Sequence, residues 1–464
     1  MLQMLRNEIV FWSAWIIIPL LFEIIPAIGN FIILLLKKFR LRKKVELTFW
    51  PDITIIVPVY NSSATLEECI DSIAYSNYDN SLIDIFLIDN GSKDNSFEIF
   101  QKCQLKHKNL AMNWTTSKQG KSRALNKALF NSTGKYIINI DSDGMLEKNA
   151  LRNLITRFET HDDINCQTGV ILTNPEMIED TKNLFLRIFR KLEFMEYCQA
   201  FLAGRNFESE SNGIFTLSGA FSAFRKSTIL STWLYNTDTI CEDTHLTFQV
   251  KDMLNEKVCL CENAIFMVDP IDNYAKFYTQ RQRWQIGELE VAHMFMKKTL
   301  NNPLKSIFTD SNMRLILQDH TFAFPRLIWY FALFALAALN YSFDMVIKAT
   351  FVIYVLYVFT SFLYFLNINS FLNDFKDIRK YYVKHILYLT LLPIYNLNAF
   401  FVRLAGIVNC IVRPISWKTL TPKEENIEMK NVLVKDFSFI KTINKVTRKL
   451  LEQEEDTIDG VNDI

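Results

Sequence analysis

The sequence predicts an α/β domain with a mostly parallel sheet, flanked by transmembrane α-helices. The run Ile53–Val59 is apolar without interruption, which is typical of a strand buried on both faces of a parallel sheet. Strand-like runs then alternate with helical patterns, as they do in α/β domains. Apolar stretches of bilayer length lie on both sides of residues 46–310, which contain none.

The N-terminal apolar stretch, Val10–Leu36, is long enough to cross a bilayer as a helix. A cluster of lysines and arginines follows it directly, whereas only Arg6 precedes it. Because the basic flank of a span stays in the cytoplasm, we expect the N-terminus outside and the next domain inside. Residues 1–45 therefore form the first predicted unit, with a span over about 10–36 and a basic flank.

The C-terminal apolar region, residues 311–412, predicts further spans at about 321–340 and 349–366, joined by a short loop. The stretch 386–412 is apolar but interrupted by polar residues, and two alternatives stay open for it. It is a third C-terminal span, or a bent segment that lies partly in the membrane interface. The count of spans, three or four, and the side of the charged tail 413–464 depend on this choice. The predicted location is the plasma membrane, with several crossings and a cytoplasmic domain at 46–310.

Within that domain, strands and helices alternate in an order that places several polar residues at strand ends. The sequence predicts strands at 53–59, 83–88 and 136–140, and helices from about 66, through 97–100 and over 121–130. In open parallel sheets, ligands bind outside the carboxyl ends of the strands. The residues that fall there are Tyr60, Asn61, Asp89, Asp141 and Asp143.

Asp141 and Asp143 directly follow the predicted strand 136–140 and have one residue between them. Alternation along an extended segment puts both carboxylates on the same side. Two carboxylates in this arrangement suit Mg²⁺ or Mn²⁺, and the cation can hold a diphosphate. The pair therefore predicts a metal site for a diphosphate-containing substrate.

A nucleotide-sugar would find partners nearby. Asp89 could accept hydrogen bonds from a uracil or a ribose, and Lys118, Lys121 and Arg123 could face the base or the phosphates. Each residue also has a plainer interpretation. Asp89 could serve only as a turn former, and the lysines could be ordinary surface charge.

The acidic pair Glu242-Asp243 offers a general base, and Asp243 is the candidate to take a proton from an attacking hydroxyl. In the later run Gln280-Arg-Gln-Arg-Trp284, Arg283 with Gln280 could hold a pyrophosphate, and Trp284 could stack on an acceptor sugar. The alternatives are a solvated acidic pair at a helix start and an amphipathic helix on the membrane. Ser218-Gly219 could likewise be only a turn.

Composition argues against a nucleic-acid-binding protein and against a disulfide-bonded one. The net charge is +1 and no basic stripe is present, so the sequence predicts no nucleic-acid partner. The eight cysteines show no Cys-x-x-Cys spacing, and we expect free thiols in a reducing compartment.

These segments resemble the processive, membrane-integrated members of the inverting family 2 glycosyltransferases, such as cellulose, hyaluronan and poly-N-acetylglucosamine synthases. Val57-Pro-Val-Tyr-Asn61, Asp89-Asn-Gly-Ser-Lys-Asp94 and Gly120-Lys121 with Ala124-Leu-Asn126 are similar to motifs of the nucleotide half. Asp141-Ser-Asp143, Ser218-Gly219, Cys241-Glu-Asp243 and Gln280-Arg-Gln-Arg-Trp284 are similar to the metal, acceptor, base and polymerising motifs. The chain also resembles Gram-positive bacterial members encoded beside an exosortase-like protease. Asn90 and Cys241 depart from the family pattern.

The resemblance implies a GT-A fold, with interfacial helices near 274–300. It implies an inverting transfer from a UDP-sugar to a glycan or a lipid-linked acceptor. Tyr60 and Asn61 would bind the nucleotide-sugar, and Ser218 and Gly219 the acceptor. It also implies a product channel through the spans, by which a growing chain would cross the bilayer. Because few spans are visible, a homo-oligomer or an accessory subunit could complete this channel. Membrane lipid is a further expected partner.

Two other functions stay open at this point. One is transfer of a single sugar to a lipid carrier, against which the complete Gln280-to-Trp284 run argues. The other is a catalytically inactive membrane scaffold, against which the intact Asp141, Asp143 and Asp243 argue.

Overall fold

The structure is a computed structural model that describes residues 16–17, 19–39, 46–299, 331–332, 334–336, 338–339, 343–412, 420–425 and 427. Most of the predicted span 321–340 lies outside these residues, as does most of the predicted tail 413–464. The start of the predicted span 10–36 lies outside them as well.

An eight-stranded mixed sheet forms the centre of the described domain, with strand order β3-β2-β1-β4-β7-β6-β8-β5. The strands are β1 Ile53–Val59, β2 Ile83–Asp89, β3 Ala111–Thr116, β4 Tyr136–Ile140, β5 Gly144–Leu146, β6 Ile164–Thr173, β7 Phe221–Arg225 and β8 Lys257–Val268. The predicted strands at 53–59, 83–88 and 136–140 are confirmed as β1, β2 and β4.

The sheet is parallel from β3 to β4 and mixed beyond that point. β7 pairs antiparallel with both β4 and β6, β5 pairs antiparallel with β8, and β6 and β8 run parallel. The prediction of a mostly parallel sheet therefore describes the first half of the domain and needs correction for the second. The reason is that β7 lies between β4 and β6, although several helices separate it from β6 in the sequence. No local sequence pattern predicts this position for the strand.

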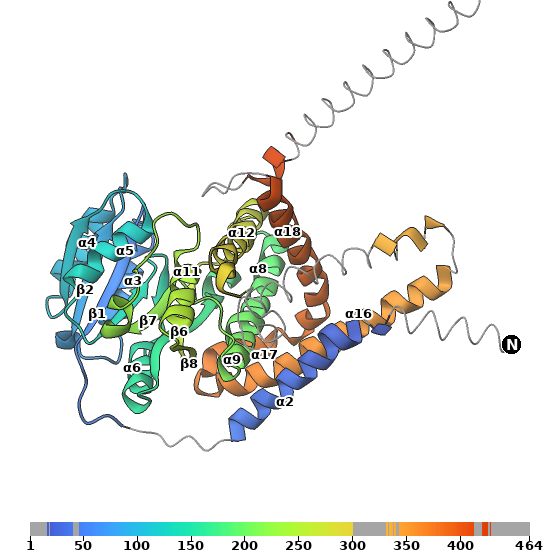
Figure 1. The fold of residues 1–464 in the computed structure, drawn as a ribbon, viewed down its shortest axis with the longest axis horizontal. Coiled ribbons are helices and arrows are strands. Elements are labelled where there is room, and N and C mark those ends of the chain that lie inside the picture. The colour runs from blue at the N-terminus through green and yellow to red at the C-terminus, as the bar shows by residue number, and fades with distance from the viewer. Residues whose placement is uncertain are drawn as a thin grey trace, which may run out of the picture.

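Helices cover both faces of the sheet and build a second group beside it (Figure 1). Those of the sheet domain are α3 Leu66–Ala74, α4 Ser96–Lys106, α5 Lys121–Asn131, α6 Ala150–Thr160, α7 Pro175–Glu179, α8 Leu184–Tyr197, α9 Arg205–Glu210, α10 Lys226–Leu230 and α11 Glu242–Phe248. The others are α2 Ile25–Phe39, α12 Tyr274–Thr299, α16 Phe343–Phe371, α17 Lys376–Lys384 and α18 Leu392–Val412. Helix α5 confirms the predicted helix over 121–130.

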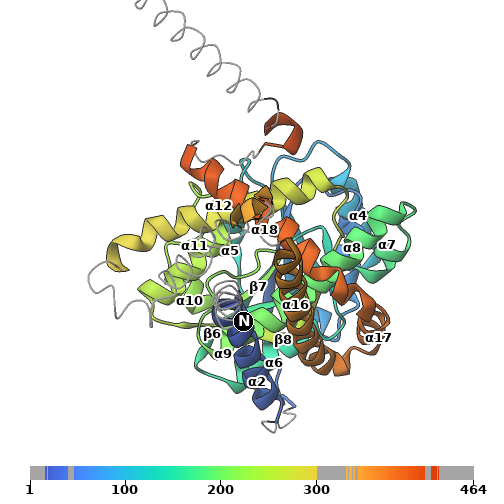
Figure 2. The ribbon, with the colours of Figure 1, turned by 90° about the vertical axis from the view of Figure 1, so that its right-hand side faces the viewer.

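Helices α12 and α18 lie side by side (Figures 1 and 2). Polar side chains of α18 hydrogen-bond to α12: the Tyr274 hydroxyl donates to Asn398, and Arg403 Nε donates to Gln285. At Gly406 the two backbones come so close that an added Cβ would lie 3.3 Å from the Cα of Gln282. The polar residues that interrupt the apolar stretch 386–412 therefore serve the contact with α12.

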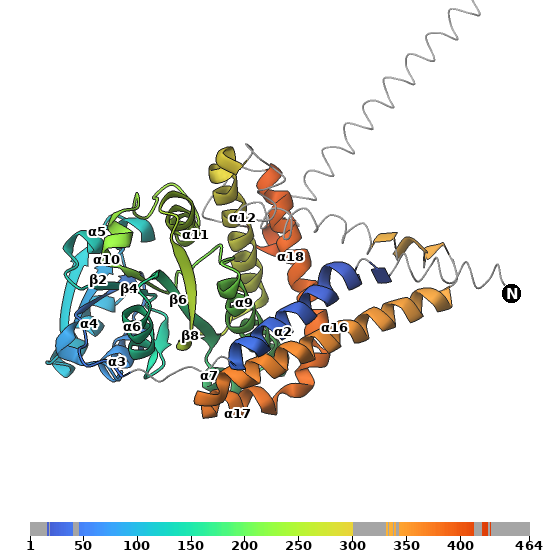
Figure 3. The same cartoon turned by 60° about the horizontal axis from the view of Figure 1, so that its bottom comes forward.

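Helix α2 runs along α16 (Figures 1 and 3). Asn30 Nδ2 donates to the Tyr364 hydroxyl, and Lys37, 5% exposed, forms an ion pair with Glu210 and donates to Asn206. Among the described residues, one helical segment, Phe343–Asp374, is long and apolar enough to cross a membrane, with a mean hydropathy of 2.0. It contains the predicted span 349–366.

Candidate active site

The carboxyl ends of β1 and β2 bring the first predicted residues together. Val59 pairs with Asp89 in the parallel register, so Tyr60 and Asp89 lie at the same edge of the sheet. Asn61 has a left-handed φ of 51°, and its side chain accepts a hydrogen bond from the Lys93 N–H. Asp89 Oδ1 accepts from the Ser92 N–H at 2.9 Å. Both polar side chains thus shape the turn after β2, in addition to any role toward a ligand.

The departure at Asn90 has a structural explanation. Asn90 is buried, and its Oδ1 accepts a hydrogen bond of 2.6 Å from the N–H of Gly120. Gly120 has a φ of 134°, a conformation that favours glycine. The amide of Asn90 therefore fixes the turn that leads into α5 and its Lys121. The sequence marked Asn90 only as a departure from the family pattern, with the nucleotide contact assigned to Asp89 alone, and this positioning role was missed.

Lys118 lies on an open groove of about 600 Å³ next to this edge, lined by Thr116, Ser117, Lys118, Arg123 and Lys127. The β2–β3 register pairs Asp89 with Thr116, so the groove begins beside the predicted uracil contact. Its volume is in the range of small-molecule sites. Lys118 thus lies on an open surface, and its contact with the nucleotide stays a prediction.

Lys121 lies among the carboxylates of the site. Its Nζ is 2.5 Å from Asp141 Oδ1, 3.8 Å from Glu242 Oε1 and 3.4 Å from the Gly219 carbonyl oxygen. Burial disfavours the Lys121 ammonium, but the charges of Asp141 and Glu242 outweigh it and raise its pKa. Lys121 was predicted to face the base or phosphates, and the structure places it where the strand end, the acidic pair and the Ser218-Gly219 loop meet.

The pair Asp141 and Asp143 has the electrostatics of a cation site. The Asp143 side chain reaches solvent but lies in a recess, and desolvation, with the charge of Asp141 next, raises its pKa to about 6. Among the described residues, no group of three or more His, Cys, Asp or Glu could hold a metal ion. Two carboxylates still fit Mg²⁺ or Mn²⁺, because Mg²⁺ typically takes one or two protein carboxylates and completes its shell with phosphates and water.

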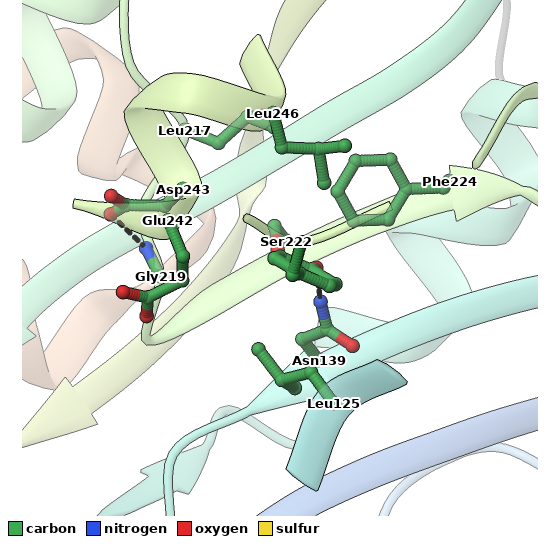
Figure 4. Close-up of a pocket in the computed structure, with 10 residues that line it drawn as sticks. Leu125, Asn139, Leu217, Gly219, Ser222, Phe224, Glu242, Asp243 and Leu246 are labelled. Atoms are coloured by element: carbon green, nitrogen blue, oxygen red, sulfur yellow. Dashed lines mark hydrogen bonds between the residues drawn. The ribbon is translucent and has the colours of Figure 1, made fainter. Parts of the chain in front are cut away.

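Asp243, at the start of α11, is held by the Ser218-Gly219 loop. Its Oδ2 accepts a hydrogen bond of 3.1 Å from the Gly219 N–H (Figure 4). Its Oδ1 accepts from the Thr244 N–H at 2.7 Å. An added Cβ on Gly219 would lie 2.9 Å from Asp243 Oδ2, so the close approach requires glycine. The predicted base and one predicted acceptor residue are therefore in direct contact.

Glu242 faces Lys121 instead. It is 7% exposed, and burial raises its pKa to about 7 against the opposing charge of Lys121. Its proximity to Lys121 indicates a role in holding that ammonium, beside the predicted catalytic role of the pair.

A small cavity lies beneath the acidic pair (Figure 4). It has about 10 Å³ of room for the centre of a water molecule, and its lining includes Asn139, Ser222, Tyr235, Glu242 and Asp243. Such a cavity holds at most one water and is too small for a sugar.

The run from Gln280 to Trp284 lies on α12, and Trp284 is fixed by its neighbours. The Arg281 guanidinium is 4.6 Å from the centroid of the Trp284 ring, and Phe201 meets that ring edge-on at 6.3 Å. Arg281 is buried and pairs with Glu196. One face of Trp284 is thus covered by a cation. The sequence reasoning missed Arg281, although it lies inside the recognised run.

Gln280 and Arg283 complete the predicted set. The Gln280 side-chain oxygen is buried and accepts no hydrogen bond from the described residues, which suits a ligand contact. The Arg283 carbonyl lies 4.0 Å from Cys241 Sγ, next to the acidic pair. A Cβ on Gly287 would come within 2.0 Å of the same sulfur, so α12 packs directly on the segment that begins α11. No local signal in the sequence marked Gly287 as this contact.

The mixed α/β sheet, with these side chains at its edge, has the GT-A type of fold. Residues 54–229 match the family described as Glycosyl transferase family 2. The chain therefore carries a glycosyltransferase domain of family 2, as the sequence motifs predicted.

Curated proteins with similar sequences are named as polysaccharide synthases. The chain is 24% identical over 260 residues to a poly-beta-1,6-N-acetyl-D-glucosamine synthase of Staphylococcus aureus (strain COL), covering 55% of this chain and 59% of the relative. It is 25% identical over 243 residues to the protein of the same name from Staphylococcus epidermidis, covering 52% and 55%. The match thus spans somewhat more than half the length of these relatives.

Among solved structures, a mannosyltransferase from Pyrobaculum calidifontis in complex with GDP-Man and Mn2+ aligns with a TM-score of 0.54. The alignment has 17% sequence identity and covers 78% of this chain and 95% of that one. At this identity the likeness supports the fold alone.

Proposed function

We propose that the chain is an inverting glycosyltransferase that moves a sugar from a UDP-sugar to the hydroxyl of a growing glycan at the cytoplasmic face of the membrane. One observation carries the proposal. Lys121 Nζ pairs with Asp141 and donates to the Gly219 carbonyl oxygen, and the N–H of the same glycine donates to the Asp243 carboxylate. A proton acceptor and a site for a diphosphate leaving group are thereby joined through one lysine.

In the proposed reaction, Asp243 accepts the proton of the acceptor hydroxyl, and that oxygen attacks the anomeric carbon as UDP leaves from the opposite side. Asp141 and Asp143 would hold Mg²⁺ or Mn²⁺, which when bound supplies charge stabilisation for the leaving diphosphate. Gln280 and Arg283 would contact the pyrophosphate, and Trp284 the acceptor sugar. Lys121 keeps Asp141 and Glu242 in place beside the acceptor loop.

The proposal extends to polymer synthesis and to the membrane. The names of the curated relatives make UDP-N-acetylglucosamine the first donor to test and a β-linked polymer the expected product. The apolar α16 supports a membrane location, and the polar contacts of α18 with α12 support the bent interfacial alternative for 386–412. A homo-oligomer or an accessory subunit would then complete a channel.

The test uses the full chain in lipid nanodiscs with Mn²⁺ or Mg²⁺. UDP release is followed for a panel of UDP-sugars, with GDP-mannose included, and any labelled product is sized. We expect UDP release from one UDP-sugar and a ladder of products, because the complete run from Gln280 to Trp284 is typical of polymerising enzymes.

Each other result has a definite meaning. A single small product attached to lipid would replace polymer synthesis by transfer to a lipid carrier. Release from GDP-mannose alone would overturn the choice of uridine nucleotide. UDP binding without release from any donor, even with added glycan primer and lipid extract, would favour the inactive scaffold.

A further inference from the structure

In the loop from Thr216 to Ala220, three consecutive backbone N–H groups donate to side chains of other segments. The Leu217 N–H donates to Thr247 Oγ1, the Ser218 N–H to Thr168 Oγ1 and the Gly219 N–H to Asp243 Oδ2. The Thr247 hydroxyl in turn donates to the Asp243 carbonyl oxygen. Because this loop is not part of a helix or strand, its geometry near Asp243 depends on these contacts.

Arg205 is the buried cation that reaches this loop from outside the recognised motifs. Its Nη1 donates to Ser218 Oγ at 2.6 Å and lies 3.5 Å from Thr168 Oγ1, the same hydroxyl that accepts from the Ser218 N–H. The Arg205 side chain is 8% exposed. One guanidinium nitrogen therefore ties the side chain of Ser218 to the hydroxyl that holds its backbone.

The approach of Arg205 is fixed by the chain before it. Residues Cys198–Gly204 form a π-helix, a local widening that is often found at functional sites, and Arg205 directly follows it. The guanidinium carbon lies 4.8 Å from the centroid of the Phe201 ring. Phe201 is also the ring that meets Trp284 edge-on. Phe201 thus contacts both the acceptor-side tryptophan and the arginine of the loop.

A buried guanidinium is costly unless its hydrogen bonds and nearby charges compensate for lost hydration. Burial lowers the pKa of Arg205, and the negative charges that oppose this are those of Glu208, Asp243 and Glu288. A purely packing role would be met by an apolar side chain of similar length. Arg205 instead donates a hydrogen bond to Ser218, and its positive charge interacts with the negative charge of Asp243, the proposed base.

We propose that Arg205 is a positioning residue for the transfer reaction: through Ser218 it fixes the loop whose Gly219 N–H orients the Asp243 carboxylate. This inference rests on the proposed function, and it names a residue that acts without contacting donor or acceptor. Loss of Arg205 releases Ser218, so the Gly219 N–H no longer holds Asp243 in one direction. A displacement of a reacting group by about 1 Å can lower a rate about 10²-fold.

The first test does not depend on activity. Hydrogen exchange of the full chain in nanodiscs reports on the backbone amides of Leu217, Ser218 and Gly219, which are all hydrogen-bonded to side chains. Arg205→Met is expected to increase exchange of the peptide that contains them at least about tenfold, since the loop opens locally. Unchanged exchange in this peptide would overturn the proposal, whether or not the protein transfers sugar.

The second test separates positioning from stability by kinetics. Arg205→Met is expected to lower kcat about 10- to 100-fold with a donor KM within about twofold of the wild type. Arg205→Lys, which keeps the charge and one donor, should recover part of the loss. Ser218→Ala removes only the accepting hydroxyl, and the double variant should be no slower than Arg205→Met alone. Additive losses in the double variant would contradict the route through Ser218.

Arg225 offers a matched control. It also packs on aromatic rings, 5.6 Å from the centroids of Tyr136 and Phe158, and donates to buried carbonyl groups, but it lies at the other end of β7. Arg225→Met should lower the thermal stability and leave kcat per folded molecule unchanged. Equal losses of kcat in Arg205→Met and Arg225→Met would contradict the proposal, because they would show that Arg205 acts only through the stability of the fold. If Arg205→Met does not fold, both tests are made with Arg205→Lys and Ser218→Ala instead. Wild-type hydrogen exchange of the loop peptide in both of these variants would contradict the proposal.

Discussion

Asp243→Asn is expected to lower kcat about 10²- to 10⁴-fold, the usual range for loss of a general base. Asparagine has nearly the same shape as aspartate, and its single amide oxygen can still accept the Gly219 N–H. The second contact, with the Thr244 N–H, is lost in the exchange because the amide nitrogen cannot accept a hydrogen bond. What it lacks is a carboxylate that can take the proton of the attacking hydroxyl. The measurement is the initial rate of UDP release with saturating donor and acceptor, together with the Kd for UDP, which should stay within about twofold because the nucleotide site is untouched.

Asp238→Asn is the matched control, because Asp238 is an exposed aspartate on the segment that leads to α11. It should retain the wild-type rate. An Asp243→Asn variant that binds UDP normally and keeps more than about a tenth of the wild-type kcat would contradict the assignment of the base, since a rate loss below tenfold corresponds to less than about 1.4 kcal/mol.

Asp143→Asn is expected to abolish the stimulation of UDP release by Mg²⁺ or Mn²⁺ and to lower kcat by about 10²-fold or more, since a bound cation contributes several kcal/mol to the leaving of a diphosphate. In the structure, desolvation raises the pKa of Asp143, and the negative charge of Asp141 adds to this rise. Replacing one of the two carboxylates relieves this repulsion but leaves a single carboxylate for the cation. The variant should therefore fold normally and fail only in the metal titration.

The readout for this variant is Mn²⁺ binding in the presence of UDP, measured by electron paramagnetic resonance, beside the rate. Asp162→Asn serves as the control, because Asp162 is fully exposed and lies beside Arg225, which pairs with the start of β4 and not with the end that carries Asp141. Wild-type activity that survives complete removal of divalent cations would exclude the metal role of Asp141 and Asp143.

The sequence predicted the nucleotide half of the fold well because its signals are local. A continuous apolar run marks β1, and a polar residue marks the end of each parallel strand, so Asp89 and Asp141 could be placed at one edge. The second half carries no comparable signal. Strand β7 inserts between β4 and β6 in the antiparallel direction, and this pairing is decided by tertiary contacts that sequence spacing does not express.

In the candidate site, too, some residues could be predicted from sequence motifs, whereas the contacts between them could not. Asp243 and Gly219 could be named from motifs, but their direct hydrogen bond joins residues 24 positions apart and follows only from the fold. Arg205 has no motif of its own, and its relevance appears only when its guanidinium is seen on Ser218. Asn90, noted in the sequence as a departure, proves to hold Gly120. Residues that act through another residue leave no spacing rule by which to find them.

The anomeric configuration of the product tests the central claim most directly, because a single displacement assisted by Asp243 must invert the reacting carbon. The wild-type enzyme in nanodiscs is supplied with an α-configured UDP-sugar, and the newly formed linkage is assigned by proton NMR of the purified product. We predict a β linkage. An α linkage formed from the same donor would show retention of configuration and would contradict Asp243 as the base of an inverting transfer.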